Sequence, residues 1–299
     1  MIEGLRSQSA MEYLMTYGWA ILIIAIILVA LFSLNLFNSY TFAPKAPPGA
    51  CQVLRPNGPG SNVFVTMEGG SNCNGVIPEY TAQFNGQSSS IVTGTKLLPL
   101  GDEARSAFMW IYVENLTRDY IIEGYGNYST TLGNQYVALW LYGGYIYFGD
   151  NQESFYGNNL PKTDLGKWYF VGYSYSGGAS NTITVYLDTV NDTAPMQKAL
   201  NTTLPASQAA FIGAGLGGYG YGFYKGDISN VQIYNSSLSK NDVNALYQEG
   251  IGGAPIDLQN LVGWWPLDGN ANDYSGNGNN GVPSRVTYTS SWESGYSAP

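Results

Sequence analysis

The sequence predicts a mainly β protein, in which an N-terminal apolar helix is followed by an antiparallel β-sandwich. From residue 79 onward, short runs rich in Val, Ile, Tyr, Phe and Trp are separated by Gly, Asn and Pro. Several runs alternate apolar with polar residues, most cleanly in residues 182–187. One long apolar run, from Gly18 to Phe37, stands apart near the N-terminus. Many short strands with turn signals between them are typical of an antiparallel sandwich.

The apolar run is long enough to cross a membrane. Between Gly18 and Phe37 the polar residues are Ser33 and Asn35, and a spanning helix needs ~20 apolar residues. Arg6 precedes the run and Lys45 is the first basic residue after it. Because positive charge favours the cytoplasmic side, we expect a single-pass protein of the cell membrane with its bulk outside the cell.

The polar residues before the run form an unusual motif, Ser7-Gln-Ser-Ala-Met-Glu-Tyr13. Together with the apolar helix it resembles the archaeal class III signal peptide of type IV pilin-like proteins. The resemblance implies that a prepilin-type peptidase cuts between Ser7 and Gln8, which removes the leader 1–7 and leaves the helix 8–38. Glu12 would then lie one turn from the new amine, and a neighbouring subunit's amine would neutralise it in a helix bundle. The alternative is a signal anchor that stays in the membrane, with Glu12 at the headgroups.

Composition excludes several classes of function. The chain of 299 residues is 44% hydrophobic and only 11% charged, with a net charge of −9. A nucleic-acid-binding protein would carry the opposite charge. There is no His, so His-based catalysis and His metal sites are excluded.

The segment after the helix is expected to lie in an oxidising space. Residues 39–50 form a Pro-rich linker, and residues 51–78 form a small segment that contains Cys51 and Cys73. Two cysteines just outside a membrane helix favour one disulfide, the alternative being two buried thiols. Asn-x-Ser/Thr sequences, which fit exposure outside the cell, lie at Asn115, Asn127, Asn191, Asn201 and Asn235.

The strands of the sandwich are expected at residues 80–84, 89–94, 105–113, 136–142, 145–149, 168–176, 181–189, 209–213, 227–235 and 261–267. One helix interrupts them. Ser239 and Asp242 form a capping-box pattern, an apolar stripe follows, and Gly250 is placed to end the helix.

Residues 79–250 resemble the laminin G or concanavalin A-like jelly roll. The resemblance rests on AQFNGQSSSIV, SAFMWIYV, KWYFVGYSYSGGASNTITVYLD, FIGAG and KGDISNVQIYNSSLSKNDVNALYQEG. In that family the strand WWPLDGNANDYSGNGNNG normally comes first, whereas here it lies at 261–282. The resemblance implies a jelly-roll domain over 79–299 whose first strand is supplied from the C-terminus.

The loop after that strand is a candidate structural calcium site, because it gathers carboxylates, amides and glycines that can offer oxygen ligands. The resemblance adds an acidic residue from the D-I-S-N strand. The expected ligands are Asp268, Asn270, Asp273, Asn277 and Asp227. The alternative is a glycine-rich turn whose Asp and Asn side chains bond their own backbone.

Catalytic motifs are missing. Glu residues are scattered, without the strand-alternating pair that a sandwich glycosidase would use, so an enzyme is not expected. Tyr219, Tyr221 and Tyr224 in a Gly-rich segment are candidates for stacking on sugars, the alternative being packing on the sandwich edge. Trp110, Trp140 and Trp168 are predicted to lie in the core.

The sequence therefore predicts a pilin-like filament subunit that self-assembles through its N-terminal helix and displays a lectin-like domain for adhesion to a glycan or surface. The first alternative is a monomeric membrane-anchored glycan-binding protein, and a weaker one is a surface glycosidase. The filament subunit and the monomeric anchor would contain the same domains, so only the Gln8–Glu12 motif distinguishes the two hypotheses.

Overall fold

The computed structural model describes Tyr17 and residues 20–26, 51–54, 63–66, 78–127, 135–149, 154–156, 160–204, 210–215 and 222–299. The predicted processing residues Ser7, Gln8 and Glu12 lie outside the described residues, as do Cys73, Tyr219 and Tyr221. The chain divides into two units, residues 1–50 with 67–69 and the remainder.

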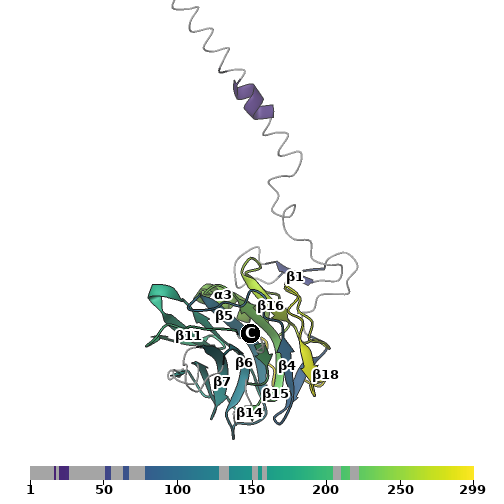
Figure 1. Cartoon of the computed structure of the whole chain (residues 1–299). Helices are drawn as coiled ribbons and strands as arrows, with labels where there is room; N and C mark the ends of the chain where they lie inside the picture. The colour runs from purple at the N-terminus through teal and green to yellow at the C-terminus, as the bar shows by residue number, and fades with distance from the viewer. Residues whose placement is uncertain are drawn as a thin grey trace, which may run out of the picture. The chain divides into compact units, whose positions relative to one another are not determined.

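In the first unit, residues 20–26 are helical and exposed, in the middle of the predicted apolar helix. Among the described residues, none of the helices has both the length and the apolar character that a membrane span requires. At the start of the second unit, β1 (Cys51–Leu54) and β2 (Val63–Thr66) pair as an antiparallel hairpin (Figure 1).

The rest of the second unit is a β-sandwich of two eight-stranded sheets. Sheet I holds, in spatial order, β12 (Val190–Pro195), β11 (Thr182–Leu187), β10 (Trp168–Tyr175), β5 (Arg105–Val113), β15 (Lys225–Tyr234), β3 (Thr81–Asn85) and β18 (Thr287–Thr289), and β16 (Leu261–Trp265) also pairs with β15. Sheet II holds β17 (Val282–Ser284), β4 (Ser90–Thr93), β13 (Ala210–Ile212), β6 (Tyr120–Gly126), β7 (Tyr136–Tyr142), β8 (Tyr145–Gly149) and β9 (Ser154–Tyr156), and β14 (Gly222–Phe223) runs parallel to β6. Every other pairing is antiparallel, so the mainly β sandwich is confirmed.

The core lies between the sheets and is built by alternation along each strand. In β11, Ile183, Val185 and Leu187 point into the main core, as the sequence predicted. In β7, Val137 and Leu139 do the same. Each such side chain contributes about 1.5–3 kcal/mol when it leaves water.

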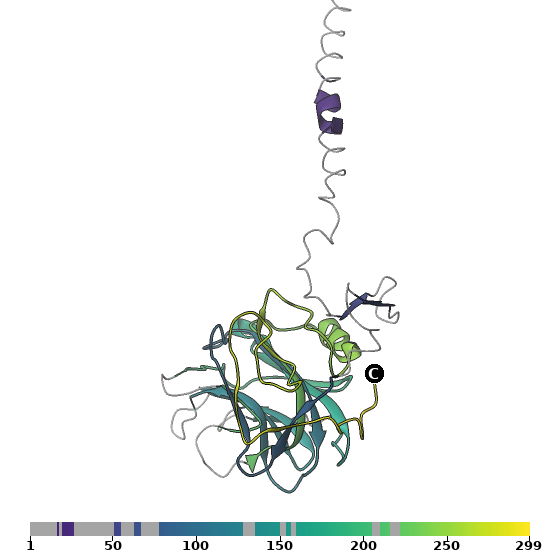
Figure 2. The same cartoon turned by 90° about the vertical axis from the view of Figure 1, so that its right-hand side faces the viewer.

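A second layer covers the outer face of sheet I. Helix α3 (Lys240–Glu249) begins at Ser239, whose hydroxyl accepts a hydrogen bond from the Asp242 amide in the predicted capping box, and Gly250 ends it. Trp110 of β5 stacks on Tyr247 of α3, with ring centroids 5.8 Å apart. Figure 2 shows α3 packed on the sandwich, with the C-terminus near it. Trp110 and Trp168 are therefore buried, as predicted.

The C-terminal segment contributes strands to both sheets. The strand with the Trp264-Trp265 pair, β16, lies antiparallel to β15 in sheet I. Farther along, β17 pairs with β4 in sheet II and β18 pairs with β3 in sheet I. Strands that were not predicted from the sequence are the edge strands β12, β17 and β18, the short strands β1, β9 and β14, and the central strand β6.

Candidate functional site

The outer face of sheet II carries a row of aromatic side chains on strands β7 and β8. Residues 136–142 alternate strictly, so Val137, Leu139 and Leu141 enter the core while the intervening residues point to the outer face. Trp140 pairs with Tyr147 across the strands, and Tyr142 pairs with Tyr145. Because directly paired residues share a face, these four side chains form one surface, which we call the aromatic face.

The aromatic face is graded in exposure. Tyr142 is 54% exposed, Trp140 and Tyr145 are half-buried, and Tyr147 is 9% exposed at the base of the row. The rings of Tyr142 and Tyr147 lie 6.1 Å apart between centroids, tilted by 48°. Rings that are anchored on a rigid sheet and still reach solvent offer an apolar surface with polar edges.

The turn between the two strands is made by Gly143 and Gly144, with φ of 55° and 91°. Two consecutive positive φ values make a tight hairpin turn for which glycine is suited. A side chain at Gly144 would place its Cβ 3.2 Å from the carbonyl oxygen of Thr163. The close approach of residues 160–167 therefore depends on this glycine.

The loop of residues 160–167 lies against this end of the aromatic face. The Thr163 amide donates to the Gly144 carbonyl oxygen at 2.8 Å, and the Thr163 hydroxyl donates to the same oxygen at 3.2 Å. The Lys162 ammonium lies 4.7 Å from the centroid of the Tyr145 ring. This loop brings the one cationic contact of the aromatic face that the described residues show.

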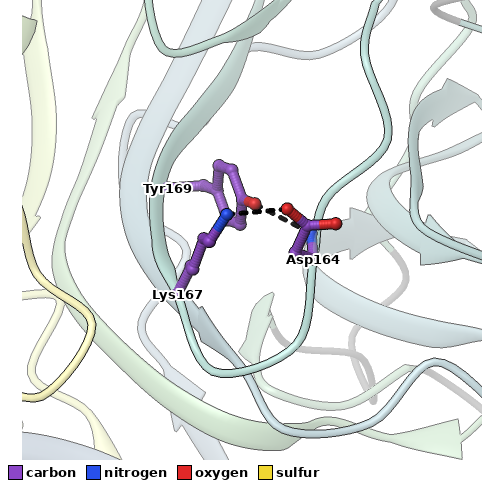
Figure 3. Close-up of polar contacts among 3 residues, drawn as sticks. All are labelled: Asp164, Lys167 and Tyr169. Carbon is purple, nitrogen blue, oxygen red and sulfur yellow. Dashed lines mark hydrogen bonds and ion pairs between the residues drawn. The ribbon is translucent and has the colours of Figure 1, made fainter.

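A polar network holds the far end of the same loop (Figure 3). The Lys167 ammonium lies 2.8 Å from the Asp164 carboxylate, and the Asp164 amide donates to the Tyr169 hydroxyl at 2.8 Å. The bond to Asp164 raises the pKa of Lys167. Both partners are exposed, so the ion pair contributes little stability. Because the Asp164 carboxylate already neutralises the Lys167 ammonium, Lys167 is less available than Lys162 to a charged ligand on the aromatic face.

Strands β6, β7 and β8 hold a single carboxyl group, that of Glu123. Glu123 pairs with Leu139 and Ile212, both core residues, next to a bulge in β6. Its side chain is fully buried, neither carboxyl oxygen has a hydrogen-bond partner among the described residues, and burial raises the pKa to about 8. Glu123 therefore belongs to the core, and none of these three strands presents a carboxylate on the aromatic face.

The predicted calcium loop is tied to its own backbone. Asp273 Oδ1 accepts from the amides of Trp264 and Ser275 at 3.0 and 2.8 Å, and Oδ2 accepts from the Asn279 amide at 2.7 Å. Asn277 Nδ2 donates to the carbonyl oxygens of Leu261 and Val262. These contacts are those of the turn alternative.

The remaining predicted calcium ligands have other partners. Asp268 Oδ1 accepts from the Tyr80 amide at 2.7 Å, and Asn270 Oδ1 accepts from the Asn272 amide at 2.9 Å. Asp227 is 4% exposed on β15, and its Oδ2 accepts from the Thr81 hydroxyl at 3.3 Å, whereas its Oδ1 has no hydrogen-bond partner among the described residues. Burial, with a smaller contribution from Glu114, raises the pKa of Asp227 to about 6. Among the described residues no three Asp, Glu, His or Cys side chains gather as a metal site would require. Calcium binding therefore stays a prediction.

Tyr224 lies in the core rather than on a sugar-binding surface. It is fully buried, and its hydroxyl donates to the Tyr112 carbonyl oxygen at 2.8 Å. Trp140, predicted to be a core residue, instead lies half-buried on the outer face of sheet II. The signal that could have placed it there is the shared parity of the aromatic residues in YVALWLY and YIYFG.

The predicted glycosylation residues differ in exposure. Asn201 and Asn235 are exposed. Asn115, Asn127 and Asn191 are half-buried. The Asn127 Nδ2 group also donates to Gln135 Oε1 at 2.9 Å. Asn201 and Asn235 are thus the more accessible acceptors.

Comparison with protein families gives a match over residues 85–244, more than half of the chain, to the family Laminin_G_3, described as the concanavalin A-like lectin/glucanases superfamily. The chain belongs to this superfamily. The matched range runs from the end of β3 into α3 and contains the whole aromatic face. A comparison with curated proteins found no match.

Several solved structures are similar to this superfamily member at low sequence identity. A candidate carbohydrate-binding protein from Bacteroides ovatus is 14% identical with a TM-score of 0.54, over 77% of this chain and 66% of that chain. A pentraxin from Limulus polyphemus is 16% identical with a TM-score of 0.44, over 56% of this chain and 81% of that chain. The CBM40 of a Ruminococcus gnavus IT-sialidase, bound to α2,3-sialyllactose, is 10% identical with a TM-score of 0.45, over 57% of this chain and 98% of that chain. The likeness to the Bacteroides ovatus structure shows the fold alone.

Proposed function

We propose that the sandwich is a carbohydrate-binding module that acts through the aromatic face. The observation that carries the proposal is the solvent-reaching row of Trp140, Tyr142 and Tyr145 on rigid, paired strands. Pyranose rings present apolar C–H faces that stack on aromatic rings, while tyrosine hydroxyls can bond the sugar hydroxyls. The similarity to the candidate carbohydrate-binding protein from Bacteroides ovatus supports this proposal.

The residues of β6, β7 and β8 favour a module that binds carbohydrate without cleaving it. A glycosidase needs two carboxyl groups ~5–9.5 Å apart that flank the bound sugar. The one carboxyl group of β6, β7 and β8 is turned into the core. A weaker proposal, a surface glycosidase, would need carboxyl groups from other segments.

We further propose that the module is displayed outside the cell by the N-terminal helix, and that this helix assembles into a filament after cleavage before Gln8. The support is the sequence motif of Ser7 to Tyr13 and the apolar run after it. The alternative is a monomeric membrane anchor with the same module. Sheared surface filaments that contain the mature protein would favour the first over the second.

The aromatic face is tested by Trp140→Ala and Tyr142→Ala in the full chain, with binding measured on a panel of immobilised polysaccharides. Both variants should reduce retention on whichever polysaccharide binds the natural protein, because each removes a stacking surface. Tyr274→Ala is the matched control, since Tyr274 is also 54% exposed but lies in the C-terminal loop. Unchanged retention of the Trp140 and Tyr142 variants would exclude this face as the site.

A further inference from the structure

We infer that the aromatic face selects acidic glycans, and that Lys162 is the residue that selects them. This inference rests on the proposed function, and it adds the chemical class of the ligand and the group that recognises it. The observation behind it is the place of the Lys162 ammonium, 4.7 Å from the centre of the Tyr145 ring.

Lys162 is held where a ligand on the aromatic face would meet it. Its stem lies beside the turn, because a Cβ built on Gly144 would be 3.5 Å from the Lys162 Cβ. The next residue, Thr163, is fastened to Gly144 by two hydrogen bonds. The lysine therefore has a backbone fixed to the same hairpin that presents Tyr142 and Tyr145.

The charge of Lys162 is left for a ligand. The described ion pair on this loop joins Lys167 to Asp164, and Lys162 forms no ion pair with a described residue. An ammonium group has three N–H donors, and contact with one aromatic ring leaves donors available for a ligand. A carboxylate or sulfate on a sugar stacked beside Tyr145 would receive a charge-assisted hydrogen bond there.

The net negative charge of the chain means that binding of an acidic glycan depends on a local cation. With a net charge of −9, the protein as a whole repels polyanions, so attraction to an acidic glycan requires a local cation at the point of contact. Arg118 and Asp119 directly precede β6, at the end of that strand where Tyr120 pairs with Leu141 of β7. The opposite charges of these two neighbours offset each other, so the cation in contact with a ring of the aromatic face among the described residues is Lys162.

The experiment compares polysaccharides that differ in charge alone. The probes are polygalacturonate against its methyl ester, and dextran sulfate against dextran, with the full chain and with Lys162→Met. The natural protein should bind the acidic member of a pair more tightly. Lys162→Met should lower that affinity about tenfold, as expected for one charge-assisted hydrogen bond. Added salt should weaken the binding of the natural protein more than that of the variant.

Lys167→Met is the matched control, because Lys167 lies on the same loop but is already paired with Asp164. It should leave binding to the acidic probes unchanged, and Lys162→Arg should retain most of it. Equal binding of acidic and neutral probes, or unchanged acidic binding by Lys162→Met, would overturn the inference and leave the proposed function standing. If the natural protein binds none of the probes and no member of the wider panel, the proposed function fails as well.

Discussion

Glu123 and Arg105 are both buried in the core between the two sheets, yet no hydrogen bond joins them. The Arg105 guanidinium donates to the hydroxyl groups of Tyr125 and Thr202 and to the carbonyl oxygens of Leu100, Gly101 and Glu103. Within the part of the chain that the structure describes, the Glu123 oxygens have no hydrogen-bond partner. The positive charge of Arg105 lowers the Glu123 pKa less than burial raises it. The core therefore holds a cation with satisfied donors beside a carboxyl group that is neutral at pH 7.

The raised pKa of Glu123 predicts that folding stability falls as pH rises. The pKa is about 8 in the folded chain against 4.5 ordinarily, so the folded state holds a proton that the unfolded state has released. The contribution is full below pH 4.5, decreases up to about pH 8, and is constant above it. Glu123→Gln should be more stable than the natural protein at pH 9 by a few kcal/mol, with a smaller difference at pH 5. Urea unfolding at both values measures this, and equal pH slopes for the two proteins would refute it.

Arg105→Met should be strongly destabilising. It would leave two buried hydroxyl groups and the carbonyl oxygens around them without their donor. Each unsatisfied buried group costs about 1–3 kcal/mol, so a loss of about 3 kcal/mol or more is expected. The urea midpoint measures the loss. A drop below about 1 kcal/mol would mean that water replaces the guanidinium.

Ser239→Ala should remove the cap of α3. The hydroxyl accepts from the Asp242 amide at 3.3 Å, and the Asp242 carboxylate accepts from the Ser239 amide at 3.0 Å. The loss should be about 1 kcal/mol, seen as a fall in Tm of a few degrees. Ser291→Ala, at an exposed position near the C-terminus, should change Tm little. If both variants change the Tm by the same small amount, the Ser239 cap does not contribute measurably to stability.

The two interpretations of the loop that contains Asp273, a calcium site or a turn, predict different thermal stabilities. If Asp273 is a calcium ligand, calcium should raise the Tm of the metal-stripped protein, and Asp273→Ala should abolish the rise. If it is the centre of a turn, Asp273→Ala should lower the Tm in the presence of a chelator, because three backbone amides lose their acceptor. Thermal melts of both proteins with and without calcium separate these outcomes. If calcium does not change the Tm of the natural protein, the calcium site is excluded.

Processing of the N-terminus is a prediction from sequence. Protein taken from the native membrane should begin at Gln8, and a chain that begins at Met1 or Ile2 would exclude the pilin-like proposal in favour of the anchor. Glu12→Gln should insert normally but yield fewer filaments, because the carboxylate that neutralises the neighbouring amine is lost. Filament recovery after shearing, compared with the membrane-bound amount, measures this effect.

Local patterns in the sequence were sufficient for the elements whose partners lie nearby. The alternation of residues 182–187 and the capping box at Ser239 and Asp242 appear in the structure as predicted. Each depends on interactions over a few residues, which composition and spacing record directly. The two-sheet architecture followed from the number and spacing of such strands together with the family resemblance.

Which aromatic residues reach solvent was decided only by the tertiary structure. Trp110 and Trp140 both lie on outer faces of their sheets, and both were predicted to be buried. Trp110 is 2% exposed because α3 and the C-terminal segment, far away in the sequence, pack over it. Trp140 remains half-buried on sheet II. A strand's own residues determine which side chains share a face, but the segments that cover that face come from elsewhere in the chain, so the aromatic face and its lysine became visible only in three dimensions.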